Sequence, residues 1–451
     1  MEKRTNKTQL LLFICAILAV LSFSSCKDDD EQQAGSEAVL TDFFPTSGKK
    51  ETMLTLNGEN IGASRKDVRV WINDKEVEVI NVTQNKINVR VPSKAGSGDI
   101  KVKIGDKEFT YPTKFEYIPD YIVTTYAGNG IQGWEDGPVE NAKFHNLTWL
   151  ACDPKDGTVY TLETDFDAST SQRIRRIKNG EVVTVIDFKD AKHTVKLNNP
   201  RTIEFSMTGD TIFISNDNGN NANNLHAVAI ATRNGDFKEL KAYVPSAKTI
   251  SPHLNFAGVN PVDGTLVYYS YLGKIYKWDN ETQQATELAD ALPVFRIVHG
   301  SIGGSYGSLR FSRDGKKLYV ISRDPYQGIL SADYNIETKT LDSPLKRFAG
   351  TGNWGNNDGW GTEAGMDFPS QGTFGSDGNL YLVERNNHCV RRVTPTGEVT
   401  FFAGSPGAGY ADGEASAAKF NHPLGFTIDK DGNMFVADNV GNRIRKISLE
   451  E

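Results

Sequence analysis

Cysteine is scarce in this chain, with four residues among 451. Two of them lie in the first 26 positions, and the others, Cys152 and Cys389, stand in different copies of a repeated pattern. No group of cysteines and histidines has the spacing of a zinc ligand set, and a bridge between Cys152 and Cys389 would need two separate repeats to approach each other. The scarcity excludes a disulfide framework and predicts two free, buried thiols.

An excess of positive charge is also missing. Lysine and arginine total 50 against 57 aspartate and glutamate residues, which gives a formal net charge of −7 and a pI near 5.7. Neither nucleic acid nor an anionic membrane is therefore expected as the main partner. The sequence has no recognisable Ser/His/Asp or Cys/His motif, and no paired acids stand out from the surface background. These absences predict a protein that is not an enzyme and that uses no cofactor.

The one long apolar run, Leu10 to Phe23, is too short for a bilayer span and follows a positively charged start. It ends at Ser24-Ser25-Cys26, and the whole segment resembles a bacterial lipoprotein signal with its lipobox. The resemblance implies that residues 1–25 are a signal peptide and that Cys26 is lipidated, so that acyl chains alone hold the protein on the membrane. An ordinary secretory signal with a chance cysteine is the alternative.

The residues after Cys26 are acidic. Lys27-Asp28-Asp29-Asp30-Glu31 resembles the export tag of surface lipoproteins in glycan-foraging Gram-negative anaerobes. The resemblance implies an acidic tether over residues 26–36 and a location in the outer membrane, facing the cell exterior. A solvated charged tether without an export role is the simpler interpretation, and the two are compatible.

The segment 37–118 reads as an all-β domain. Short stretches such as Ile87 to Val91 alternate apolar and polar residues with the period of two that a half-buried strand requires. Further strands are expected at 53–56, 68–72, 76–80 and 100–104. The motifs Phe44-Pro45-Thr46-Ser47-Gly48, Leu56-Asn57-Gly58 and Phe115-Glu116-Tyr117 resemble the IPT/TIG immunoglobulin-like domain, which implies a sandwich that serves as a spacer.

A glycine-rich unit occurs three times in the rest of the chain, at Ala127–Gly137, Ala349–Gly359 and Ala403–Gly413. Its recurrence predicts a fold made by stacking one unit. The segments 372–393 and 423–447 resemble the NHL repeat closely, and weaker copies bring the total to about six. The resemblance implies that residues 119–451 form an NHL β-propeller of roughly six blades, in which the glycine-rich units are connectors.

The last repeat lacks an outer strand, because the chain ends soon after Ile447. The missing strand is present at the other end of the domain, as Tyr121 to Gly128. We therefore expect this N-terminal segment to pair into the last blade and to close the ring, which removes an open sheet edge.

Aromatic side chains are the candidate ligand contacts, because a sugar ring presents C–H faces that stack on Trp or Tyr. Trp134 and Tyr410 share one repeat position, where an aromatic residue packs its own loop. The candidates are the aromatic residues that depart from the repeat or lie in blade loops: Trp354, Trp360, Tyr306, Tyr326 and Trp149.

Histidines precede three of the expected inner strands, at His145, His253 and His422. Imidazoles that converge on a propeller axis can hold zinc, as in NHL-type folds with amidating-lyase activity. Such residues are also ordinary NHL sequence, and no carboxylate accompanies them in register. No metal is predicted, and the three histidines remain weak candidates.

The whole pattern predicts a non-catalytic surface lipoprotein that binds an extracellular ligand, with the propeller as the binding domain. A lipobox, an acidic tag, a TIG spacer and a terminal β-domain resemble surface glycan-binding proteins that work beside an outer-membrane porin-type transporter. The resemblance implies a glycan ligand and membrane attachment through the lipid only. Two alternatives stay open: a protein-interaction scaffold of an outer-membrane complex, and a metal-dependent lyase or hydrolase in the propeller channel.

Overall fold

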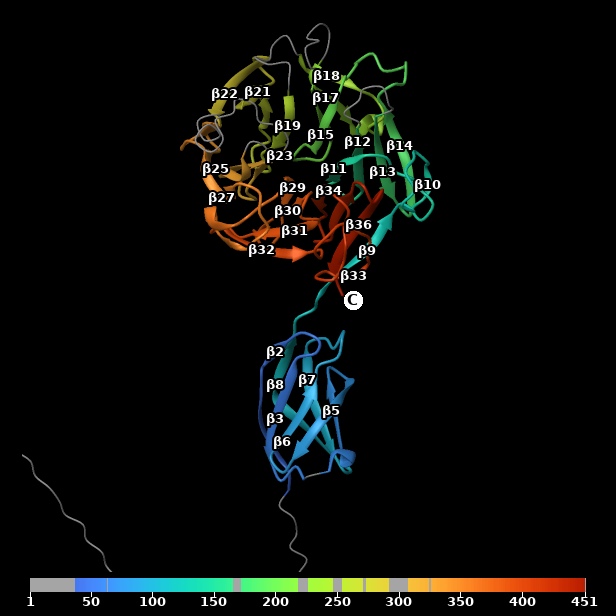
Figure 1. Ribbon diagram of the computed structural model, residues 1–451, viewed down its shortest axis with the longest axis vertical. Helices are drawn as coiled ribbons and strands as arrows, with labels where there is room; N and C mark the ends of the chain where they lie inside the picture. Colours follow the sequence, from blue (N-terminus) through green and yellow to red (C-terminus); the bar gives the residue numbers. More distant parts are fainter. Residues whose placement is uncertain are drawn as a thin grey trace, which may run out of the picture. The chain divides into compact units, whose positions relative to one another are not determined.

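The computed structural model describes residues 37–62, 64–164, 172–217, 226–245, 254–270, 273–291, 307–323 and 326–450. The expected signal peptide, the acidic tether and Cys26 lie outside these residues. Strands make up most of the described chain, and no helix within it is long and apolar enough to cross a membrane. Contacts divide the chain into two compact units, one within the segment up to Glu116 and one that contains Tyr117–Glu451 (Figure 1).

The first unit is an Ig-like domain whose strands are hydrogen-bonded in the order β1-β3-β6-β5-β4-β7-β8-β2. Their bounds are β1 (Val39–Phe44), β2 (Ser47–Gly48), β3 (Met53–Glu59), β4 (Val68–Ile72), β5 (Lys75–Thr83), β6 (Lys86–Arg90), β7 (Gly98–Ile104) and β8 (Lys107–Tyr117), with a 3-10 turn, η1 (Arg65–Asp67), before β4. Ile87 and Val89 are fully buried whereas Arg90 is exposed, as the alternating pattern predicts. All five strands expected from the sequence are present.

The second unit is a six-bladed β-propeller, which confirms the predicted fold class. Six antiparallel sheets surround a central axis, with one innermost strand from each sheet nearest to it (Figure 1). The first three blades are β11 (Leu147–Cys152), β12 (Val159–Glu163), β13 (Arg173–Lys178) and β14 (Glu181–Asp187), with β10 (Gly137–Pro138); β15 (Pro200–Phe205), β16 (Thr211–Asn216), β17 (His226–Thr232) and β18 (Lys241–Pro245), with η2 (Arg233–Gly235); and β19 (Leu254–Val259), β20 (Leu266–Ser270), β21 (Lys274–Asp279) and β22 (Gln284–Asp290).

The other three blades follow the same order from the axis outward. They are β23 (Gly307–Phe311), β24 (Lys317–Ser322), β25 (Gln327–Asn335) and β27 (Lys346–Gly352), with β26 (Thr340–Leu341); β29 (Pro369–Phe374), β30 (Leu380–Glu384), β31 (Cys389–Val393) and β32 (Glu398–Ala403), with β28 (Gly359–Trp360) and η4 (Gly361–Glu363); and β34 (Pro423–Ile428), β35 (Met434–Asp438), β36 (Arg443–Leu449) and β9 (Tyr121–Ala127), with β33 (Gly413–Glu414). Buried apolar side chains fill the space between neighbouring blades.

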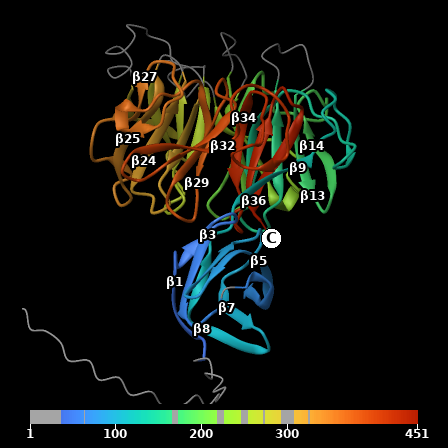
Figure 2. The ribbon, with the colours of Figure 1, turned by 60° about the horizontal axis from the view of Figure 1, so that its bottom comes forward.

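Strand β9 closes the ring, as the sequence predicts. It lies antiparallel to β36 in the sixth blade, with Val123 opposite Ile447 and Tyr121 opposite Leu449 (Figure 2). Val123 is fully buried among residues of the fifth and sixth blades. The first strand of the propeller therefore completes the sheet that its last residues leave open.

We expect Val123→Asp to lower the free energy of unfolding by more than about 3 kcal/mol, because it buries an unpaired carboxylate in the closing strand. Thr124→Asp is the matched control, since the neighbouring side chain is exposed and such surface changes cost about 0.5 kcal/mol or less. Urea denaturation followed by tryptophan fluorescence measures both. Equal stability of the two variants would show that β9 does not hold the ring closed.

Candidate ligand-binding site

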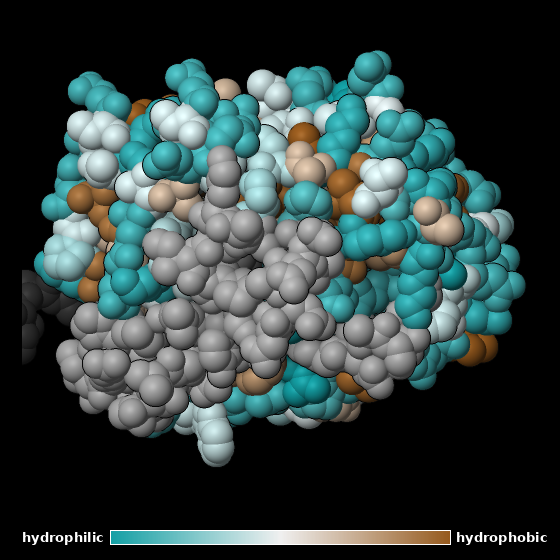
Figure 3. Space-filling view, turned by 90° about the horizontal axis from the view of Figure 1, so that it is seen from above, coloured by the Kyte–Doolittle hydropathy of each residue, from teal (hydrophilic) through white to brown (hydrophobic). Residues whose placement is uncertain are grey.

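Two of the predicted aromatic candidates are displayed to solvent. The side chain of Trp354 is 80% exposed and that of Trp360 is 56% exposed, whereas most aromatic rings of the propeller are buried. The remaining exposed hydrophobic residues of the propeller come from separate elements, and Figure 3 shows a mainly hydrophilic face on which hydrophobic residues lie scattered. Exposure of this kind leaves both indole rings available to a ligand.

The two tryptophans lie at opposite ends of the fifth blade. Trp354 precedes Gly355, whose carbonyl accepts a hydrogen bond from Asn387 in the turn before β31. Trp360 pairs with Glu398, which follows the turn after β31. Strand β31 has five residues, a length of about 16 Å at roughly 3.3 Å per residue. We therefore expect an extended chain, rather than a single sugar ring, to contact both indoles.

The other aromatic candidates have different surroundings. Tyr326 is fully buried, and its hydroxyl donates to the carbonyls of Ala349 at 3.2 Å and Gly350 at 2.7 Å. Its prediction as a ligand contact is wrong, because it packs the core and ties β27 in place. Trp149 lines the central channel but is 5% exposed. Tyr306 lies outside the described residues.

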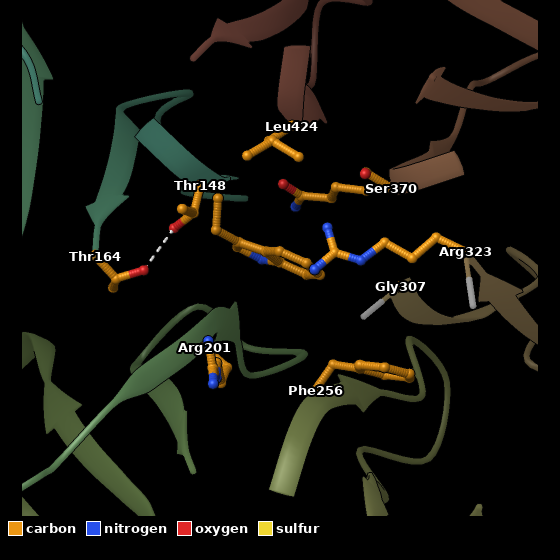
Figure 4. Close-up of a pocket in the computed structure, with 10 residues that line it drawn as sticks. Thr148, Thr164, Arg201, Phe256, Gly307, Arg323, Ser370 and Leu424 are labelled. Atoms are coloured by element: carbon orange, nitrogen blue, oxygen red, sulfur yellow. Dashed lines mark hydrogen bonds between the residues drawn. The ribbon is translucent and has the colours of Figure 1, made fainter. Parts of the chain in front are cut away.

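The channel has a narrow mouth where the inner strands begin. Figure 4 shows its lining residues converging from the six blades, with Arg323 reaching toward the middle and a 3.2 Å hydrogen bond between Thr148 and Thr164. Arg201 also lines this mouth and forms a 2.8 Å ion pair with Asp217. The cavity volume is about 60 Å³, enough for a few water molecules but far below the size of ordinary ligand pockets.

The channel has a wide mouth at the other ends of the same strands. Its volume is about 520 Å³, within the usual range for small-molecule sites. Three phenylalanines from different blades, Phe205, Phe311 and Phe374, form an apolar part of its lining. The polar residues include Glu204, which stands beside Phe205.

A layer of bonded side chains separates the two mouths. Arg310 pairs with Glu204 at 2.7 Å, and Trp149 Nε1 donates to the same carboxylate at 3.1 Å and to the Ile203 carbonyl at 3.0 Å. Burial raises the pKa of Glu204, and the charge of Arg310 opposes that effect. Gln371 borders both mouths and bonds only backbone groups of neighbouring strands.

The predicted histidines take part in local packing. His145 lies against Trp134, with ring centres 4.6 Å apart, and its backbone N–H donates to Glu163. His422 packs edge-on against His388 and bonds Asn421 through its ring. His253 lies outside the described residues. Among the residues that the structure describes, no three histidine, cysteine or acidic side chains cluster so as to hold a metal ion.

The two predicted thiols are free. Cys389 is buried and Cys152 is half-buried at the wide mouth. Burial raises the pKa of both thiols well above the usual value, so neither is set up as a nucleophile.

The aspartates of the glycine-rich units are structural connectors. Each one binds a fully buried arginine of the third strand: Asp136 binds Arg175 at 2.9 Å, Asp358 binds Arg391 at 2.9 Å, and Asp412 binds Arg445. The same aspartates accept hydrogen bonds from the outermost strands, at Thr184, Phe401 and Thr125. Each unit thereby locks two strands of its blade through its aspartate.

Each buried arginine also meets a second acid from the second strand. Arg391 lies 3.3 Å from Glu384, and the equivalent pairs are Arg175 with Glu163 and Arg445 with Asp438. Burial raises the pKa of each of these three acids to about 7, and the charge of the neighbouring arginine opposes that effect only in part. This second acid was not recognised from the sequence, although in each of the three blades it is the last residue of the second strand.

Comparisons with known proteins agree with this architecture. A model of the IPT/TIG domain family matches residues 38–117. The crystal structure of an auxiliary nutrient binding protein from Bacteroides thetaiotaomicron is 30% identical, and the match covers 92% of this chain and 98% of that one with a TM-score of 0.65. This chain belongs to the family of that protein. An auxiliary nutrient binding protein from Bacteroides ovatus resembles it at 26% identity, over 92% and 98% of the two chains, with a TM-score of 0.64.

Other similar proteins carry different names. A Bacteroides thetaiotaomicron structure provisionally named a phosphatase is 25% identical over 92% of this chain and 97% of its own, with a TM-score of 0.69. The curated relatives are NHL repeat-containing protein 2 of Gallus gallus, 34% identical over 18% of this chain, and SUPPRESSOR OF QUENCHING 1 of Arabidopsis thaliana, 23% identical over 73%. This chain spans 11% and 27% of their respective lengths.

The buried acids predict a pH-dependent stability. Below about pH 4.5 folded and unfolded chains both hold the Glu384 proton, and between about 4.5 and 7 only the folded chain does, so stability falls as pH rises through this window. We expect Glu384→Gln to make the fall shallower. Denaturation midpoints at pH 5 and pH 8 measure it, with exposed Glu363→Gln as control. If Glu384→Gln lowered the stability by the same amount at pH 5 and at pH 8, the raised pKa of Glu384 would be contradicted.

Proposed function

We propose that this protein is a lipid-anchored protein of the outer membrane that binds an extracellular glycan and catalyses no reaction. The observation that carries the proposal is the pair of exposed indole rings on the fifth blade, Trp354 and Trp360. Indole faces stack on the C–H faces of sugar rings. Their separation along the blade suits an extended polysaccharide that contacts both ends.

The domain order supports the same role. The predicted lipidation at Cys26 and the acidic tether place the chain at a membrane surface, the Ig-like domain acts as a spacer, and the propeller carries the binding surface. The family relationship to proteins named for nutrient binding supports an extracellular ligand. A porin-type transporter of the outer membrane is the partner that would take up the captured glycan.

The tryptophans are tested by single and double alanine variants. We expect Trp354→Ala plus Trp360→Ala to weaken binding to the polysaccharide selected on a glycan array about tenfold, since each stacking contact contributes about 0.5–1.5 kcal/mol. The single variants show which end of the blade makes the stronger contact. Isothermal titration gives the affinities.

Exposed Tyr410, in the equivalent unit of the sixth blade, supplies the matched control as Tyr410→Ala. Unchanged affinity of the double variant would remove the two indoles from the site. No binding to soluble starch, xylan, pectin or mucin glycans, together with capture of one outer-membrane protein, would replace the glycan proposal with the scaffold alternative.

The anchor is tested by labelling cells with a palmitate analogue. We expect the wild-type chain to take up the label and Cys26→Ala to lose it and leave the membrane fraction, because no other membrane attachment is proposed. Cys152→Ala should keep the label. Labelling of Cys26→Ala at the wild-type level would contradict the anchor, and protection of the wild-type chain from protease in intact cells would contradict a location outside the cell.

A further inference from the structure

The wide mouth holds polar atoms that the fold does not use. Glu204 directs Oε1 to both Trp149 and Arg310, and Arg310 uses Nε for the Gly372 carbonyl and Nη1 for Glu204 and the Leu309 carbonyl. Within the described part of the chain, Oε2 of Glu204, Nη2 of Arg310 and the hydroxyl of Thr373 form no hydrogen bond, and all three residues line the cavity. These atoms are available to a ligand.

The arrangement of the free atoms selects a type of ligand. Glu204 and Arg310 form an ion pair with no net charge, whose side chains are 16% and 11% exposed. A single ligand charge of either sign would be attracted by one member of the pair and repelled by the other, so it would gain little net attraction. Neighbouring hydroxyls satisfy both groups, because one donates to the carboxylate while the next accepts from the guanidinium. Arg313 at the rim is exposed to solvent and adds only a screened charge.

The apolar side of the mouth is rigid. Phe205 packs edge-on against Tyr160 and Phe237, and Phe311 does so against Tyr334. Phe374 contacts Tyr319 at a ring separation of 5.2 Å. Rings held in this way offer fixed surfaces to the C–H face of a ligand without a further loss of rotamer freedom.

We infer that the wide mouth binds one sugar ring of a neutral carbohydrate, with Glu204 and Arg310 bonding two adjacent hydroxyls and the phenylalanines contacting its C–H face. The inference rests on the proposed function in that the ligand is a carbohydrate, and it adds a second site distinct from the exposed tryptophans. The site recognises a single ring or a chain end, because the layer around Gln371 closes the mouth behind it.

The test uses the full propeller-containing chain and small probes: the methyl glycosides of glucose, galactose, mannose and xylose, with glucuronic and galacturonic acids alongside. Saturation-transfer NMR detects contact, and titration of tryptophan fluorescence reports through Trp149, which bonds Glu204 directly. We expect at least one neutral glycoside to bind and both uronic acids to bind more weakly.

Two variants address the contact atoms. Glu204→Gln places a donor where Oε2 accepts, and it should weaken glycoside binding at least tenfold. Thr373→Val keeps the shape of the side chain and should weaken binding about threefold or more. Arg313→Gln, at the exposed rim, is the control that should bind as the wild type does.

Several results would overturn the inference: no neutral glycoside binds, a uronic acid binds more tightly than every neutral sugar, or both Glu204→Gln and Thr373→Val retain wild-type affinity. The tryptophan double variant separates the two proposals, because it should lose polysaccharide binding and keep glycoside binding. Polysaccharide binding without glycoside binding overturns only this inference. Glycoside binding without any polysaccharide binding overturns only the tryptophan site.

Discussion

The propeller depends on how the backbone groups at the free edges of its inner strands find hydrogen-bond partners. Each innermost strand pairs on one side only, so its other edge presents backbone groups to the channel. Side chains from neighbouring blades bond these groups: Gln371 reaches the backbone of Leu150 and Phe426, and Thr202 accepts from Ala257. Side chains and backbone groups around the channel are therefore hydrogen-bonded to one another. The few polar atoms that have no partner among the described residues are the candidates for ligand recognition.

The fold was predictable because its structural unit repeats along the sequence. Three features predicted the same closed ring: the recurring glycine-rich units, the NHL-like segments and the missing outer strand of the last repeat. Strand β9 pairs with β36 as those features require. The second acid of each arginine cluster was not recognised, because Glu163, Glu384 and Asp438 look like ordinary strand-end residues until their arginines are placed beside them.

The sites were harder to predict, for a physical reason. Tyr326 and Trp354 are both aromatic residues in loops that break the repeat, yet one is fully buried and the other is 80% exposed. Local sequence does not determine which side of a loop a ring occupies, since packing against a neighbouring strand decides it. Glu204 and Arg310 stand 106 positions apart, in the second and fourth blades, and only ring closure brings them within 2.7 Å.

Closure by β9 also sets a condition on the order of assembly. The strand that begins the propeller finds its partner more than 300 residues later, where Val123 meets Ile447. Contacts so distant along the chain form late, after the intervening loop has been ordered. A chain that has not yet reached β36 leaves β9 without this partner and the ring open, so the sixth blade can be completed only once β36 has been made.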